Sequence, residues 1–194
     1  MVGSPIEELN RGIELFLEEV RSDPTASNCV ELGTVSFACE PRVDLMLDTV
    51  DSIYQFAIED PGGSTNMAAG VDMALALLKG RTGQYQRAGV DYYRPWMILM
   101  TDGMSTVSCD RVANHTCQLE ADRKLVVFPL AVGPEADIDT LSCFSQQRQP
   151  LRLKDLKFRE FFQWLSCSVS QVSRSQPGDQ IQLDPSGIQS WAAI

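Results

Sequence analysis

Two loops of this chain carry oxygen groups that could hold a metal cation. The first is the glycine-rich turn 62–66, in which Thr65 supplies a hydroxyl group. The second is the segment 101–103, in which Asp102 supplies a carboxylate. Because hydroxyl and carboxylate oxygens are the ligands that Mg²⁺ and Mn²⁺ accept, Thr65 and Asp102 are the candidate metal ligands.

Each of these residues also has an ordinary structural interpretation. An Asp that follows a strand often accepts hydrogen bonds from backbone N–H groups in a turn. A Thr that follows two glycines can cap the next helix. The metal interpretation therefore requires both side chains to reach the same end of one sheet.

The hydrophobic pattern predicts the elements that would bring them there. Apolar residues at helical spacing predict helices over residues 4–21, 67–78, 110–122, 138–144 and 157–172. The first of these helices begins with Ser4 as its cap and Pro5 at its first position. Alternating or continuous apolar runs predict strands over residues 30–39, 42–47, 96–100, 125–132 and 151–153.

The order of these elements indicates a doubly wound α/β fold. The first two strands are separated only by Glu40 and Pro41, too few residues for a crossover helix, so we expect them to be antiparallel. The alternation of strands and helices in the remaining chain predicts a Rossmann-like, mostly parallel sheet with that one antiparallel edge strand. Ligands of such sheets lie beyond the carboxyl ends of the strands, where Thr65 and Asp102 both fall.

One domain accounts for most of the chain. We assign residues 1–173 to it and residues 174–194 to an extended tail, in which periodicity is lost and Pro, Gly, Gln and Ser dominate. The tail carries three apolar residues, Ile181, Trp191 and Ile194, through which we expect it to dock on the domain.

The composition excludes several classes of partner. The formal net charge is −10, with 26 acidic and 16 basic residues, which argues against binding to nucleic acid or to an anionic membrane. No membrane-spanning apolar run and no secretory signal are visible, so we expect a cytoplasmic protein. Its six cysteines are then expected to be reduced, with Cys29 and Cys39 too far apart on one strand to pair.

The ordered set of motifs resembles a von Willebrand factor type A (vWA) domain. The motifs are Met-x-Gly-x-Pro-Ile at 1–6, Gly-Gly-Ser-Thr-Asn at 62–66 and Thr-Asp-Gly at 101–103. Residues 5–10 and 158–166 further resemble the bacterial TerY or YegL group, which is associated with tellurium resistance. The resemblance covers roughly residues 1–173.

The resemblance implies a metal-ion-dependent adhesion site (MIDAS). Its ligands come from an Asp-x-Ser-x-Ser loop after the first strand, a Thr in the second loop and an Asp in the third, and Thr65 and Asp102 match the last two. Met1 corresponds to the residue just after the first loop. We therefore expect the first strand and three ligands to be missing from this sequence. A start codon assigned at an internal methionine would have this result. Mg²⁺ or Mn²⁺ would then bind weakly, and two neighbouring strand edges would be left unpaired.

The function implied is recognition of a protein partner without catalysis. The cation would bind an Asp or Glu side chain of that partner, in tellurium resistance or a stress response. One alternative is a nucleotide- or phosphate-binding α/β enzyme that holds an anion at the turn 62–65, although no complete phosphate-binding motif is present. A second alternative is a metal-free structural scaffold.

Two further groups of residues suggest other chemistry. Cys109, His115 and Cys117 could hold zinc, but their spacing does not reproduce a paired Cys-x-x-Cys site and no fourth ligand is evident. His115 is also the only histidine, which removes most acid–base schemes. Three aromatic residues at helical spacing, Phe158, Phe161 and Phe162, are expected in the core rather than on a partner-binding surface.

Overall fold

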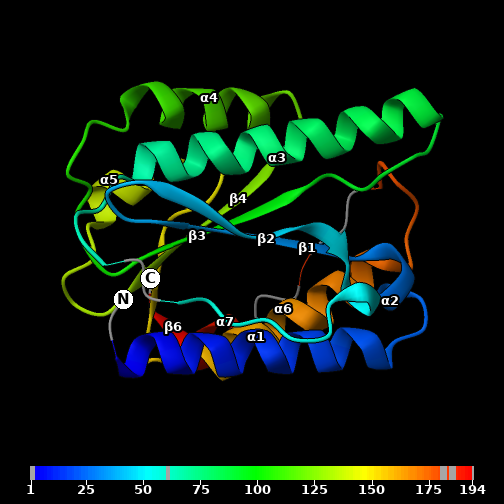
Figure 1. The fold of residues 1–194 in the computed structure, drawn as a ribbon, viewed down its shortest axis with the longest axis horizontal. Coiled ribbons are helices and arrows are strands. Elements are labelled where there is room, and N and C mark those ends of the chain that lie inside the picture. The colour runs from blue at the N-terminus through cyan, green and yellow to red at the C-terminus, as the bar shows by residue number, and fades with distance from the viewer. Residues whose placement is uncertain (1–2, 60–61, 180–182, 184–186, 194) are drawn as a thin grey trace.

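The strands form a central layer between two layers of helices (Figure 1). The structure, a computed structural model, describes residues 3–59, 62–179, 183 and 187–193. The helices are α1 (Ser4–Ser22), α2 (Ala26–Cys29), α3 (Met67–Ala88), α4 (Asp110–Ala121), α5 (Ile138–Ser142), α6 (Phe158–Ser173) and α7 (Ile188–Trp191), with a 3-10 turn η1 (Val50–Ser52). The strands are β1 (Glu31–Phe37), β2 (Pro41–Thr49), β3 (Trp96–Thr101), β4 (Val126–Val132), β5 (Leu151–Leu153) and β6 (Ala192–Ala193). Helices α3 and α4 cover one side of the strands, and α1, α6 and α7 cover the other.

The mixed α/β architecture predicted from the sequence is confirmed. Strands β1 and β2 are antiparallel, as the short connection between them requires. Strands β3, β4 and β5 are parallel to one another, and β6 is antiparallel to β5. All the helices and strands predicted for residues 4–172 are present, with bounds that differ by a few residues except that α3 extends to Ala88.

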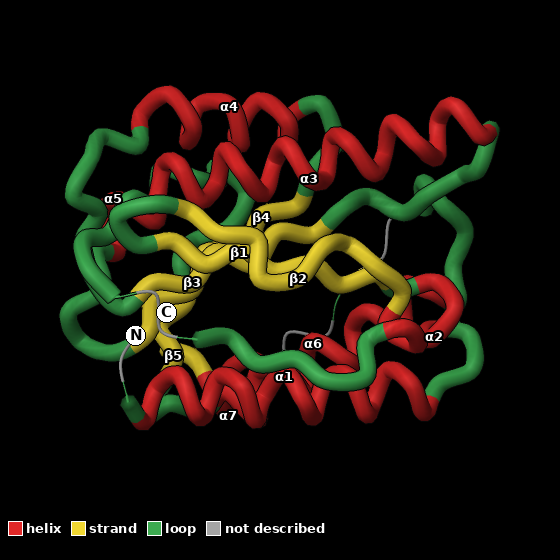
Figure 2. Tube along the Cα trace, viewed as in Figure 1, coloured by secondary structure: helices red, strands yellow, loops and turns green. Residues whose placement is uncertain are grey.

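The described strands form two sheets instead of one. One sheet has the order β1-β2 and the other has the order β3-β4-β5-β6. Figure 2 shows the two sheets lying side by side within the same layer. Within the described residues, β1 and β3 are therefore edge strands, which agrees with the prediction that two neighbouring edges are left unpaired.

Two local predictions are wrong. The cap of α1 is Gly3, whose φ of 67° places it in the left-handed region, and Ser4 is already the first residue of the helix. Glycine adopts that conformation at little cost because it has no Cβ. Cys29 and Cys39 do not share a strand, because Cys29 ends α2 and Cys39 lies in the turn between β1 and β2.

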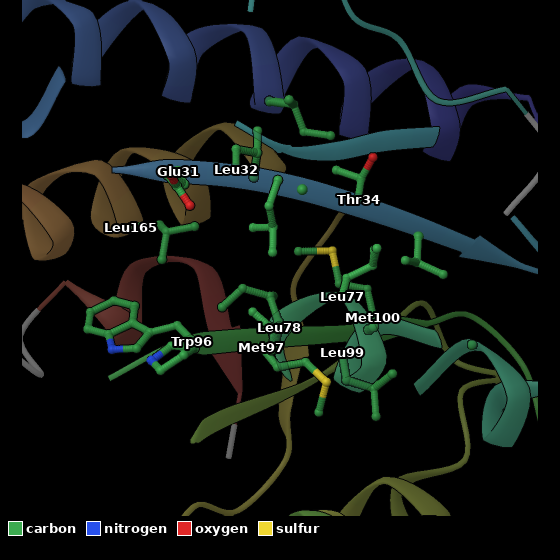
Figure 3. A pocket seen from close by; sticks show the side chains of 18 of the residues that line it. Glu31, Leu32, Thr34, Leu77, Leu78, Trp96, Met97, Leu99, Met100 and Leu165 are labelled. Carbon is green, nitrogen blue, oxygen red and sulfur yellow. The ribbon is translucent and has the colours of Figure 1, made fainter. Parts of the chain in front are cut away.

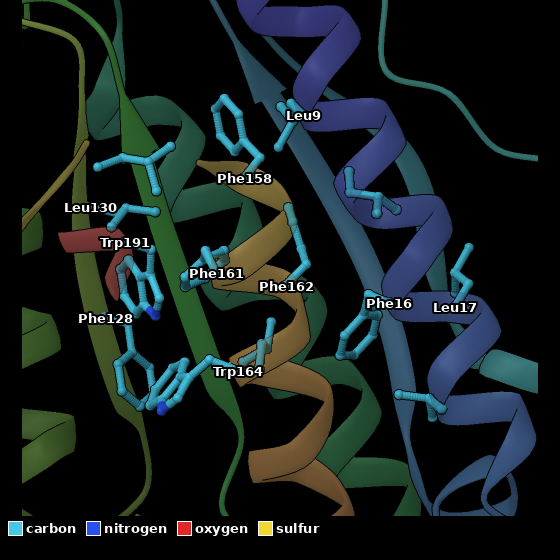
Figure 4. Packing of buried hydrophobic residues seen from close by; sticks show 14 of the residues in the cluster. Leu9, Phe16, Leu17, Phe128, Leu130, Phe158, Phe161, Phe162, Trp164 and Trp191 are labelled. Carbon is cyan, nitrogen blue, oxygen red and sulfur yellow. The ribbon is translucent and has the colours of Figure 1, made fainter. Parts of the chain in front are cut away.

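The core has one part on each side of the strands. On the α1 and α6 side, Phe158, Phe161 and Phe162 are buried, which confirms their predicted place in the core. Figure 4 shows this aromatic cluster between α1 and the strands. On the α3 and α4 side, smaller residues such as Val71 and Val112 pack against β3 and β4.

The end of the predicted tail packs against the domain. Trp191 is 1% exposed and contacts the rings of Phe161 and Trp164. The short strand β6 that follows extends the larger sheet beside β5. Ile181 and Ile194 lie outside the described residues, so the predicted docking is confirmed for Trp191 alone.

Among the described helices, none has the length and apolar character needed to span a membrane.

Candidate metal site

The loop that carries Thr65 is held against the end of β1. The N–H of Asn66 donates to the carbonyl of Ala38 at 2.8 Å. Gly62 and Gly63 have φ values of 58° and 93°, in the left-handed region that favours glycine. The two glycines therefore let the chain turn just before the start of α3.

Helix α3 is capped by Asn66 and not by Thr65. The Asn66 side chain accepts a hydrogen bond from the N–H of Ala69 at 3.1 Å. Asn is a preferred cap residue because its side-chain oxygen satisfies one of the free N–H groups at a helix start. The structural interpretation of Thr65 as the helix cap is therefore wrong.

The loop that carries Asp102 is joined to the Thr65 loop. The carbonyl of Thr65 accepts hydrogen bonds from the N–H of Thr106 at 2.8 Å and from its hydroxyl at 3.1 Å. A Cβ placed on Gly103 would lie 4.0 Å from Thr65 Oγ1, so the Thr65 hydroxyl lies beside the residue that follows Asp102. The structure thus places the two predicted ligands in adjoining loops at the same end of the strands.

Thr65 and Asp102 also line one cavity. This cavity, of about 880 Å³, lies between β1 and β3, and we call it the inter-strand cavity. Figure 3 shows Thr34 of β1 on one side of it and Met97 and Leu99 of β3 on the other. Thr65 and Asp102 lie at its end near the carboxyl termini of both strands.

The donor set for a divalent cation is incomplete. In the described part of the chain, no three Asp, Glu, His or Cys side chains lie close enough together to hold a metal ion. Thr65 and Asp102 supply one hydroxyl and one carboxylate, whereas Mg²⁺ takes about six oxygens in octahedral geometry. The described residues alone therefore do not fit a tightly bound Mg²⁺ ion.

A thiol at the same end of the strands escaped the sequence analysis. Both the N–H and the hydroxyl of Ser64 lie 3.4 Å from Cys39 Sγ and donate to it. These hydrogen bonds lower the pKa of the Cys39 thiol. No pattern in the sequence links the two residues, which are brought together by the turn after β1.

The zinc interpretation is not supported. Cys109 is buried, His115 is exposed and Cys117 is half-buried. Cys109 Sγ donates to Ser105 Oγ at 3.4 Å, while Cys117 Sγ donates to the carbonyl of Cys143 at 3.2 Å. All three residues are among those described, and they form no metal-binding group.

A half-buried ionic cluster lies at the opposite end of the inter-strand cavity. Glu31, the first residue of β1, accepts hydrogen bonds from the Arg81 guanidinium and the Tyr85 hydroxyl of α3. Burial alone would raise the pKa of Glu31, but the hydrogen bonds from Arg81 and Tyr85 hold it below its ordinary value. Burial and the Glu31 carboxylate raise the pKa of Tyr85.

Comparison with known proteins supports the fold. No protein-family model matches the chain, and no curated protein matches it. Among solved structures, it is similar to proximal thread matrix protein 1 from the mussel byssus, with a TM-score of 0.59 and 19% sequence identity over 84% of this chain and 42% of that chain. A second crystal form of the mussel protein gives the same TM-score and identity, and a further structure of it has a zinc-occupied MIDAS motif. The fold of this chain is therefore vWA-like, and the chain spans less than half the length of the mussel protein.

Proposed function

We propose that this chain is a non-catalytic protein-binding module that recognises a carboxylate of its partner through a divalent cation. The observation that carries this proposal is the meeting of the Thr65 and Asp102 loops at one end of the inter-strand cavity. The vWA-like fold and the zinc-occupied MIDAS motif of the mussel protein also support it. The cytoplasmic location stays a prediction from the lack of a visible secretory signal and membrane span, and the role in tellurium resistance stays a prediction from the sequence resemblance.

The incomplete donor set fits a cation shared with a partner. Thr65 and Asp102 would bind the ion, and an Asp or Glu side chain of the partner protein would supply further oxygens. The ion would then bind weakly to the module alone, since few protein oxygens replace its water. Mg²⁺ and Mn²⁺ are the proposed ions, and zinc belongs in the test because of the mussel protein.

Titration calorimetry with Mg²⁺, Mn²⁺ and Zn²⁺ tests this proposal. We expect weak binding of at least one ion to the unmodified chain, and a loss of tenfold or more in affinity in both Thr65→Ala and Asp102→Ala. Asp51→Ala, which removes an exposed carboxylate from η1, is the matched control and should bind as the unmodified chain does. Circular dichroism should show the same fold in all the variants.

Two results would contradict the proposal. Unchanged cation affinity in both Thr65→Ala and Asp102→Ala would place the ion elsewhere. The absence of cation binding, with or without a carboxylate probe such as glutarate, would favour the metal-free scaffold. A parallel titration with ATP tests the enzyme alternative. The start of α3 offers less support for anion binding, because the Asn66 side chain already caps it.

A further inference from the structure

Two cysteines from segments far apart in the chain lie in contact. The Cys117 thiol, on α4, donates a hydrogen bond to the carbonyl of Cys143, just after α5, at 3.2 Å. Among the hydrogen bonds of the described residues, it is the only one that joins two cysteines. Because a carbonyl oxygen lies about 2.4 Å from the Cα of its own residue, Cys117 Sγ is within about 6 Å of Cys143 Cα. This separation suits a disulfide, in which the Cα atoms lie about 4.4–6.8 Å apart.

Packing holds α4 and the residues after α5 in this relative position. The buried Thr116 hydroxyl of α4 donates to the carbonyl of Phe144 at 2.8 Å. One turn further along α4, the buried Glu120 carboxylate accepts from the Ser145 hydroxyl at 2.6 Å. Buried neighbours on both segments therefore fix the contact between the two cysteines.

The two thiols differ in accessibility. Cys143 is exposed, and its thiol donates to the carbonyl of Asp139 in α5 at 3.4 Å. Cys117 is half-buried, and burial raises the pKa of its thiol, which the nearby Glu120 carboxylate and Cys143 thiol raise further. In thiol–disulfide exchange the attacking group is a thiolate, which must also be accessible to the oxidant. Cys143 is therefore the thiol that meets an external oxidant first.

We propose that Cys117 and Cys143 form a redox modification site, at which a small external disulfide such as oxidised glutathione is exchanged for an intramolecular one. The Cys143 thiol loses its proton to solvent, and its thiolate attacks one sulfur of the oxidant. A mixed disulfide forms, and the first glutathione thiolate leaves. The Cys117 thiol then loses its proton and attacks the Cys143 sulfur, which releases the second glutathione. Two protein thiols are thus oxidised to one disulfide, while the oxidant is reduced to two thiols.

Peptide mapping after oxidation tests the proposal. The chain is incubated with oxidised glutathione, the remaining thiols are blocked with iodoacetamide, and a tryptic digest is measured by mass spectrometry without reduction. Trypsin places Cys117 and Cys143 in different peptides, 112–123 and 125–148, each of which contains a single cysteine. We expect these two peptides to be joined and to separate when a reductant is added. No cation is added, so this proposal and the proposed cation function can fail separately.

Single substitutions test the order of the two steps. In Cys117→Ser the mixed disulfide cannot be resolved, so at least tenfold more glutathione should stay bound at Cys143 than in the unmodified chain. In Cys143→Ser the shielded Cys117 should stay mostly unmodified. Cys167→Ser, which removes an exposed cysteine of α6, is the matched control and should form the same crosslink as the unmodified chain. Circular dichroism should show the same fold in all three variants.

Several results would overturn the proposal. Glutathione that stays on Cys143 of the unmodified chain, without the crosslink, would show that Cys117 does not reach it. Equal pairing of Cys143 with the other exposed cysteines, Cys29, Cys39 and Cys167, would mean that exposure alone decides the partner. A crosslink between the two peptides that is found only in covalent dimers on a non-reducing gel would assign it to a contact between two copies.

Discussion

The two edges of β3 have contrasting surroundings. On one edge, β3 pairs in parallel with β4 over six residue pairs, and all seven residues of β4 are buried. On the other edge it faces the inter-strand cavity, and across that cavity only Ser36 of the seven β1 residues is buried. The same layer of strands is thus closely packed on one side of β3 and open on the other.

The buried polar groups of Glu120, Thr34 and Ser36 illustrate the same contrast. On the packed side, the Glu120 carboxylate is 2% exposed and accepts hydrogen bonds from the Val127 N–H at 2.9 Å, the Ser145 hydroxyl at 2.6 Å and Arg148 Nη1 at 3.2 Å. On the open side, Thr34 and Ser36 have buried hydroxyl groups without described partners. The Glu120 carboxylate thus has its hydrogen-bond partners within the packed side, whereas the hydroxyl groups of Thr34 and Ser36 have none among the described residues.

The largest expected effect comes from breaking the packed side at Glu120. Glu120→Ala would leave the Val127 N–H, the Ser145 hydroxyl and the Arg148 guanidinium without their shared acceptor. We expect a loss of about 3–5 kcal/mol in the free energy of unfolding, the usual result of removing one partner from a buried ion pair. Urea denaturation measures it.

The control for Glu120 is an exposed carboxylate. Glu135→Ala, in the loop after β4, should change the unfolding free energy by less than about 0.5 kcal/mol. Similar stabilities for Glu120→Ala and Glu135→Ala would contradict the view that the Glu120 cluster holds the packed side together.

Glycine substitutions give a second, smaller contrast. A Cβ on Gly12 of α1 would lie 2.4 Å from Phe162 Cδ2, inside the buried contact between α1 and α6. Gly12→Ala should therefore cost about 1–3 kcal/mol through overpacking. Gly80→Ala, in an exposed part of α3 with no atom within 4 Å of the new Cβ, should instead stabilise by up to about 1 kcal/mol. Thermal unfolding should show a lower melting temperature for Gly12→Ala and a higher one for Gly80→Ala. Stabilisation of both variants would show that the α1–α6 contact can relax to accept the extra methyl group.

The smallest effect concerns Glu31, at the amino end of the open side. Because the folded state holds the pKa of Glu31 below its ordinary value of 4.5, its contribution to stability is present above pH 4.5 and is lost as the pH falls through the lower folded value. Glu31→Gln should cost about 1 kcal/mol near neutral pH, and the difference from the unmodified chain should shrink in acid.

Urea denaturation at several pH values between 3 and 7 measures the Glu31 effect, with Glu18→Gln, an exposed carboxylate of α1, as the control. A stability difference for Glu31→Gln that grows as the pH falls would show that the sign of the pKa shift is wrong.

Much of the fold could be predicted from the sequence because its signals are local. The apolar run before Thr101 predicted a strand and the three Phe residues of α6 predicted a core helix, and both elements are present, although only alternate residues of β3 are buried. The cap at Ser4 was wrong because the sequence does not reveal that Gly3 adopts a left-handed conformation. The packing of Trp191 was expected because it is one of the few apolar residues of the tail, but β6 was not expected, since two residues carry no periodicity.

The candidate site could be predicted only in part. Thr65 was found because it follows a glycine-rich turn and Asp102 because it follows an apolar strand, and the structure places their loops together. The Glu120 cluster and the contact of Cys39 with Ser64 could not be predicted, because each joins residues far apart in the chain. The shape of the inter-strand cavity likewise depends on how the helices cover two strand edges, which no single segment encodes.

Hydrogen exchange of the backbone amides tests the contrast between the two sides most directly. In each of β1 and β3, half of the N–H groups are directed away from the paired strand, and these should exchange much faster than the N–H groups of β4. Protection of these N–H groups equal to that of the β4 N–H groups would contradict the account.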